Sequence, residues 1–171
     1  MLKYLLPVAY FLVSPHSSAF AQHDMPAGMT HDQHMARLKQ AALRDRGRRA
    51  MKFDQDRTTH HFILRPDGGI INVEVNDPTD DTNRTAIRTH LEGIAADFAA
   101  GRFDAPFVTH DEEPPGTAAM RALRRSIRYA VEQTAGGARV RMNSTNNAAI
   151  AAIHDFLVYQ IREHQTGDPV R

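Results

Sequence analysis

The sequence predicts an α+β fold in which two ββα units form one four-stranded antiparallel sheet, with two helices packed on one face. Two observations lead to this fold class. The order strand, glycine turn, strand and amphipathic helix occurs twice, over residues 58–101 and 126–167. The apolar stripes of the two predicted helices coincide when Ile87 is aligned with Ile150. One unit cannot bury its apolar face alone, so both units are expected to share one sheet.

The first unit begins with an alternating strand predicted over 58–65. The turn over 66–69 places glycines where a tight hairpin needs positive φ angles, and a second strand follows over 70–76. Capping carboxylates at 77–81 precede a helix predicted over 82–100. The positions expected to be buried in this unit are Phe62, Leu64, Ile71, Val73, Val75, Ile87, Leu91, Ile94 and Phe98.

The second unit repeats this order. Strands are predicted over 126–134 and 138–143 on either side of an Ala-Gly-Gly turn, whose glycines we again attribute to the backbone geometry of the hairpin. Polar residues at 144–147 can cap a helix that ends near Gly167. The positions expected to be buried here are Ile127, Tyr129, Val131, Val140, Met142, Ile150, Ile153, Leu157 and Ile161.

The linker between the units, 102–125, is rich in proline and is expected to contain one short helix over 117–123. Strand alternation assigns the polar strand residues to the other face of the sheet, which we expect to be solvated and held by cross-strand charge pairs. These residues are His61, Arg65, Asn72, Glu74, Arg128, Glu132, Arg139 and Arg141.

Residues 1–21 have the pattern of a cleavable secretory signal, with one basic residue, an apolar run over 4–13 and small residues ending at Ala21. The run is too short to span a bilayer. We therefore expect export to the periplasm or the medium, with no transmembrane segment left after cleavage. Residues 22–52 are expected to form a flexible leader and a basic surface helix, and 53–171 a single α+β domain.

Charge and residue usage exclude several functions. After the predicted signal, basic and acidic side chains balance, whereas a nucleic-acid-binding protein normally has a basic face. The chain contains no cysteine, which excludes disulfides and thiolate chemistry. It also lacks the serine nucleophile elbow, the phosphate-binding loop and the dinucleotide fingerprint. We do not expect nucleic acid as a partner, and the sequence does not favour an enzyme.

The ten histidines and seven methionines provide one chemical lead. Thioether sulfur prefers Cu(I) and imidazole suits copper, zinc and nickel, so a Met/His cluster in an exported segment suggests copper. Cleavage after Ala21 would also place one histidine second from a free amine, where both groups can chelate Cu(II). Alternatively, a leader without fixed geometry simply tolerates polar residues. The candidate leader ligands are His23, Met25, Met29, His31, His34 and Met35.

A second candidate metal site lies in the folded domain. His60 follows the strand parity of the buried positions, while His90 and His154 accompany the apolar stripes of the two helices. Three imidazoles are therefore expected to converge between the sheet and the helices, and His110 of the linker would complete the set. Their spacing matches no diagnostic ligand motif. The alternative interpretation is that these histidines are hydrogen-bonded core residues without a metal.

Several short strings over most of the chain after residue 52 carry a family resemblance. They are Phe53-Asp54-Gln55, Thr58-Thr59-His60-His61-Phe62, Pro66-Asp67-Gly68-Gly69, Ile87-Arg88-Thr89-His90-Leu91, Ala152-Ile153-His154-Asp155-Phe156-Leu157 and His164-Gln165-Thr166-Gly167-Asp168. On these strings the chain resembles a group of small exported bacterial proteins of unknown function, some of which are labelled aspartate carbamoyltransferase. Transcarbamoylases are cytosolic two-domain enzymes with a Ser-Thr-Arg-Thr phosphate loop. The nearest string here, Ser144-Thr145-Asn146-Asn147, lacks the arginine, so that activity is not expected.

These observations lead to two main hypotheses. The first is an exported accessory protein that binds or handles a transition metal, with copper as the first candidate. The second is an envelope protein-interaction module, with a homodimer or an envelope protein as the partner and with structural histidines. A small hydrolase is a less supported third interpretation.

Overall fold

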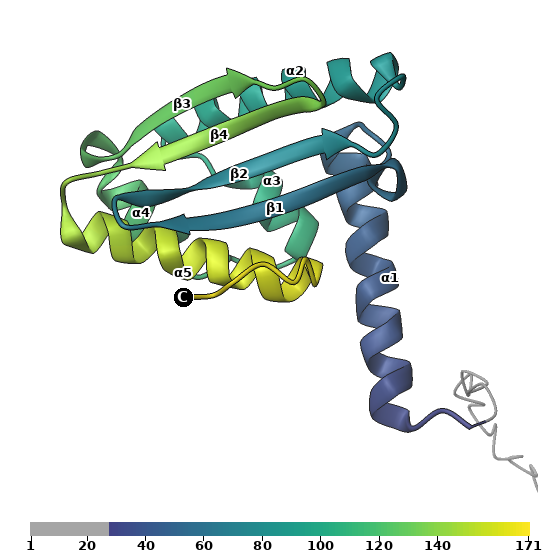
Figure 1. Cartoon of the computed structure of the whole chain (residues 1–171). Coiled ribbons are helices and arrows are strands. Elements are labelled where there is room, and N and C mark those ends of the chain that lie inside the picture. The colour runs from purple at the N-terminus through teal and green to yellow at the C-terminus, as the bar shows by residue number, and fades with distance from the viewer. Residues whose placement is uncertain (1–27) are drawn as a thin grey trace, which may run out of the picture.

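The structure is a computed structural model that describes residues 28–171. Its centre is an open, four-stranded antiparallel sheet in the order β1-β2-β4-β3 (Figure 1), which confirms the predicted α+β fold class. The predicted signal, residues 1–21, lies outside the described residues. The strands are β1 (Thr58–Arg65), β2 (Gly68–Val75), β3 (Arg128–Gln133) and β4 (Gly137–Asn143).

Helices α2 (Asp81–Ala99) and α5 (Asn147–His164) cover one face of the sheet, and α1 (His31–Met51) extends away from one end of it (Figure 1). In the described part of the chain, no helix is both long enough and apolar enough to cross a membrane. The other helices are α3 (Asp104–His110) and α4 (Thr117–Ala122), with 3-10 turns η1 (Gln55–Arg57) and η2 (Arg124–Ser126).

The register of the strands places the apolar rows where alternation predicts them. Phe62 lies opposite Ile71, and Ile71 opposite Val140, so these side chains share the face that α2 and α5 cover. Nearly all predicted core positions are buried or packed against the core, because period-2 and period-3.6 patterns bring the apolar sides of strands and helices together. Ile150 is the exception and is only half-buried.

The opposite face of the sheet carries cross-strand charge pairs. Arg139 pairs with Glu132 at 2.5 Å, and Arg141 pairs with Asp67 at 2.7 Å. Ile70 lies in the row between Ile63 and Arg141 and is nonetheless buried. The face is therefore mostly polar, as the alternation predicts.

The second glycine of the first Gly-Gly pair does not serve the turn, contrary to our expectation. Gly68 has a φ of +143° and begins β2, so only Gly68 supplies the positive φ of the hairpin. At Gly69, an added Cβ would lie 2.2 Å from Leu157 Cδ1 of α5. Gly69 is needed because the helix approaches the sheet closely at this point.

The structure contains one helix, α3, that we did not predict. We expected a single helix in the linker, and that helix is α4. Helix α3 is short and contains Pro106, which indicates a loop in a sequence pattern. Pro106 is the third residue of α3, where the backbone N–H has no partner within a helix, so proline is tolerated. This helix contributes Thr109 and His110 to the interior.

Replacing Gly116 with alanine is expected to lower the free energy of unfolding by at least about 2 kcal/mol. Gly116 has a φ of +83°, and an added Cβ would lie 2.1 Å from the carbonyl oxygen of Ala152. Urea unfolding of Gly116→Ala measures the loss. The control is Gly93→Ala in α2, where nothing lies within 4 Å and alanine should stabilise the helix by about 0.5–1 kcal/mol. Equal stabilities of the two variants would contradict the backbone contact.

A carboxylate after α5 closes the outer edge of β1. Asp168 Oδ2 accepts hydrogen bonds from the backbone N–H of Phe62 at 2.9 Å and from the hydroxyl of Thr166 at 2.7 Å. Its Oδ1 lies 2.8 Å from His61 Nδ1. An edge strand presents unpaired N–H groups that can recruit other strands, so this clamp protects the edge of the sheet.

Candidate functional site

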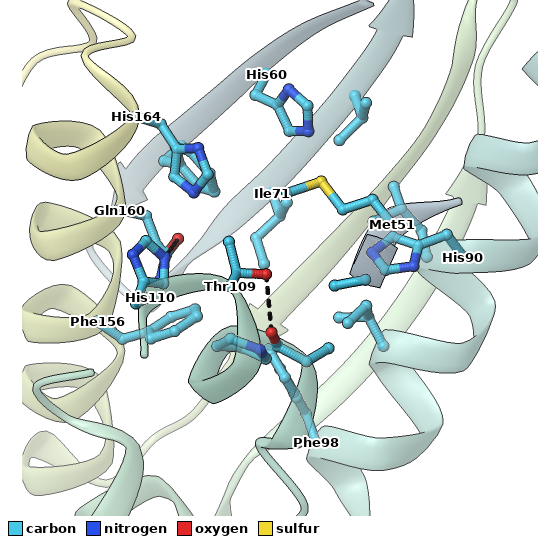
Figure 2. A pocket seen from close by; sticks show the side chains of 17 residues that line it. Met51, His60, Ile71, His90, Phe98, Thr109, His110, Phe156, Gln160 and His164 are labelled. Carbon is cyan, nitrogen blue, oxygen red and sulfur yellow. Dashed lines mark hydrogen bonds between the residues drawn. The ribbon is translucent and has the colours of Figure 1, made fainter. Parts of the chain in front are cut away.

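A cavity of about 70 Å³ lies between the sheet and the helices. Strands β1 and β2 form one wall, and α1, α2, α3 and α5 form the others (Figure 2). The lining consists of apolar side chains together with Thr109, Gln160 and four histidines. The principal apolar lining residues are Phe62, Ile71, Val73, Leu91, Phe98 and Phe156.

Each of the four histidines comes from a different element (Figure 2). His60 lies on β1 with the parity of Phe62, and His90 lies on α2 beside the buried apolar row. His110 is the last residue of α3, and His164 is the last residue of α5. The four histidines can therefore meet only when the sheet, helices α2 and α5 and the unpredicted short helix α3 are all in place.

The imidazole rings form a connected group. The ring centres of His60 and His164 are 6.0 Å apart, and their planes are 12° from parallel. His110 meets His164 edge-on, with ring centres 5.1 Å apart. His90 is linked to His60 through Phe53, whose ring centre lies 5.6 Å from His90 and 5.7 Å from His60. His164 is thus the central imidazole between His60 and His110.

Burial keeps these imidazoles neutral. Desolvation, and then the neighbouring His90 and His61, lower the pKa of His60 from 6.5 to about 4. Desolvation and Lys52 lower the pKa of His90 to about 4, and desolvation with the adjacent histidines lowers that of His164 to about 3. The pKa of His110 is also lowered by burial, against the opposing effect of Gln160. At neutral pH the rings therefore hold free lone pairs.

Two ring nitrogens face the interior without a partner. His110 Nε2 lies 3.0 Å from Gln160 Oε1. With the amide in this orientation its oxygen accepts, which assigns the His110 proton to Nε2 and the lone pair to Nδ1. Within residues 28–171, His110 Nδ1 and His60 Nε2 are buried and have no hydrogen-bond partner. Buried polar atoms normally have partners, so these two atoms are suited to hold a ligand.

Thr109 and Met51 complete the polar and soft donors of the cavity. The Thr109 hydroxyl already donates to the carbonyl oxygen of Ala105 at 2.9 Å (Figure 2). Met51 is the last residue of α1, is 8% exposed, and extends its thioether into the space between His60 and His90 (Figure 2). The weakly amphipathic α1, expected to lie on the surface, thus contributes a buried sulfur to the site.

A polar pocket of about 320 Å³ adjoins the cavity and shares His60 and His164 with it. It lies between α1, β1 and the end of α5, and its lining includes Gln40, Arg44 and Thr59. The two shared imidazoles therefore separate a polar approach from an apolar interior. A ligand that enters from this side meets His60 and His164 first.

Three of the four histidines predicted to converge do so: His60, His90 and His110 all line the cavity. The prediction for His154 is wrong. Its Nε2 lies 2.9 Å from the carbonyl oxygens of both Arg65 and Gly68, so it donates to the β1-β2 hairpin. His154 therefore stabilises this turn and lies outside the cavity.

The sequence reasoning missed His164 and Met51. The signal for His164 is present in α5, where Phe156, Gln160 and His164 recur every four residues and all line the cavity. No comparable signal marks Met51, because α1 has few apolar positions. The burial of Met51 depends on its contacts at the end of the helix.

The leader candidates are not brought to the cavity. Met29 precedes α1, while His31, His34 and Met35 lie in its first turns, with His31 and Met35 exposed. Figure 1 shows this end of α1 directed away from the sheet. His23 and Met25 lie outside the described residues.

Within residues 28–171, no three His, Asp or Glu side chains are arranged as a ready-made metal site. Comparison of the chain with protein families, curated proteins and solved structures finds no match. The functional argument therefore depends on the chemistry of the cavity.

Proposed function

We propose that the protein is a small exported accessory protein, periplasmic or secreted, that binds a transition-metal ion in the histidine cavity, with copper as the leading candidate. The observation that carries the proposal is the meeting of four imidazoles in one apolar cavity. The export part of the proposal depends on the sequence pattern of residues 1–21.

The protonation of the cavity supports metal binding. A metal ligates only the unprotonated imidazole, so a proton normally competes with the ion. In His60 and His164, burial has already shifted the pKa to about 4 and about 3. Folding therefore already keeps these two rings unprotonated, and a metal ion would not have to displace a proton from them at neutral pH.

The hydrogen bond of His110 provides further support. Metal-ligating histidines commonly donate the proton of the second ring nitrogen to an oxygen, which orients the ring. The contact between His110 Nε2 and Gln160 Oε1 has this arrangement and aims the unpartnered Nδ1 away from Gln160. We expect His60 and His110 to bind through Nε2 and Nδ1 respectively, with rotation of the rings, and His164 to join them.

Untagged protein should bind about one metal ion per chain, and His60→Phe or His164→Phe should weaken binding by at least about 10- to 100-fold. Phenylalanine keeps the ring packing and removes the ligating nitrogen. Titration with Cu, Zn, Co and Ni ions, together with elemental analysis of the exported protein, measures the effect. His31→Gln is the control, because His31 is exposed at the start of α1.

The pH dependence separates the cavity from the leader. Imidazoles in water titrate near 6.5, so affinity of a site on exposed histidines would fall steeply between pH 7.5 and 5.5. Affinity of the cavity should change little over this range, because His60 and His164 titrate far lower. Replacing all six leader donors with serine should likewise leave cavity binding intact.

The alternative function is a protein-interaction module with structural histidines. Phe107 and Val108 on α3 are about half exposed and favour this alternative, since large apolar side chains in solvent can mark a contact surface. Metal binding that is unaffected by the cavity substitutions would support it and contradict the metal proposal.

A further inference from the structure

We infer that the ion held by the cavity is monovalent Cu(I), with Met51 as a thioether ligand beside His60 and His164. This inference rests on the proposed function and names the ion and one further ligand. It depends on three features of the cavity: its neutral lining, the position of the Met51 sulfur and the adjacency of two imidazoles.

The neutral lining favours a monovalent ion. Among residues 28–171, the cavity is lined by apolar side chains, a hydroxyl, a carboxamide, a thioether and imidazoles, and no carboxylate or cationic Lys or Arg side chain is part of the lining. The cost of transferring an ion from water into an apolar environment rises with the square of its charge, and buried charges in proteins are normally compensated. The nearby acid Glu163 pairs outside the cavity with Lys39 at 2.9 Å. A dication therefore pays a much larger desolvation cost here than Cu(I).

The sulfur of Met51 adds a soft donor. Zinc and nickel are bound well by imidazole, whereas thioether sulfur selects Cu(I). The helix ends at Met51, and Lys52 follows with a left-handed φ of 60°, so the backbone fixes the point from which the thioether enters the cavity. Figure 2 shows the sulfur on the side of the cavity that faces His60.

His60 and His164 lie next to each other in the lining of the cavity. Their rings are stacked, with ring centres 6.0 Å apart and planes 12° from parallel. Both rings also line the adjoining polar pocket, so an arriving ion meets this pair first. Imidazoles together with a thioether are a ligand set that suits Cu(I) and lacks the anionic oxygens of harder sites.

The test compares Met51→Leu with Met120→Leu in the full exported chain. Met120 is fully buried but is not part of the cavity lining, so it controls for the loss of a buried thioether. Cu(I) affinity is measured anaerobically by competition with bicinchoninate, and Zn(II) affinity by competition with a colorimetric zinc chelator.

We expect wild-type protein to prefer Cu(I) over Zn(II) by at least about 100-fold. Met51→Leu should weaken Cu(I) binding by about 10- to 100-fold, leave Zn(II) affinity unchanged and remove the sulfur contribution from the copper X-ray absorption spectrum. Met120→Leu should change neither affinity nor spectrum.

Two results would overturn this inference alone: a preference for Zn(II) or Cu(II), or Cu(I) binding that Met51→Leu does not weaken. In both cases the histidine substitutions would still reduce binding and the proposed function would stand. If the protein binds none of the tested ions, the proposed function itself fails.

Discussion

Acidification below pH 6.5 is expected to destabilise the protein steeply. In the unfolded chain the cavity histidines take up protons near pH 6.5. In the folded protein, burial lowers the pKa of His60 and His90 to about 4 and that of His164 to about 3. Because the unfolded state binds more protons, this stability is fully present above pH 6.5 and is lost as the pH falls toward 4.

The expected loss is up to about 4 kcal/mol per pH unit below 6.5, since each of the three histidines contributes about 1.4 kcal/mol per unit. A domain with a stability of about 5–10 kcal/mol at neutral pH would therefore unfold between roughly pH 5.5 and 4. Urea unfolding at pH 7.5, 6.5 and 5.5 measures the slope. His164→Phe should reduce the slope by about one third, and His31→Gln should leave it unchanged. A flat profile would show that the rings are not buried and neutral.

Leu91→Ala is expected to lower the free energy of unfolding by about 2–5 kcal/mol. Leu91 is 2% exposed on α2 and packs in the main core. Truncation removes buried methyl groups and enlarges a cavity that α3 and α5 already hold open, so little collapse can compensate. Chemical unfolding monitored by circular dichroism measures the change.

The matched control is Leu38→Ala on α1, where the side chain is 40% exposed. That variant should lie within about 0.5 kcal/mol of wild type. A similar loss in both variants would mean that the apolar stripe of α2 does not face the core.

The sheet and helices α2 and α5 could be predicted from the sequence, because their apolar residues repeat with the period of the strand or helix that contains them. Such a pattern reports which face is buried, and the register of β1, β2 and β4 follows once one face must be apolar. The pattern carries no comparable information for α3, whose few residues include Pro106. Only the structure therefore shows that α3 forms the wall of the cavity that contains His110.

The candidate site could be predicted only in part, for a similar reason. His60 and His90 are placed by periodicity, but the rotation of α5 about its axis decides which of its histidines faces inward. Aligning the two helices placed His154 over Leu91. In the structure, the row of Phe156, Gln160 and His164 faces the cavity instead, and His154 lies beside the hairpin. With this rotation, Leu157 of α5 lies close against Gly69 of β2, a contact between distant residues that no local pattern reveals.

The contact of Asp168 with β1 also means that the cavity is completed late in the synthesis of the chain. His60 lies near the start of the domain and His164 at the end of its last helix, just before the residues that tie this end to β1. A chain still emerging from the ribosome contains His60 and His110 but lacks His164, the ring that lies between them. It presents only scattered imidazoles, since a preformed site rarely exists before folding. Under the proposed function, ligand uptake follows the synthesis and docking of α5.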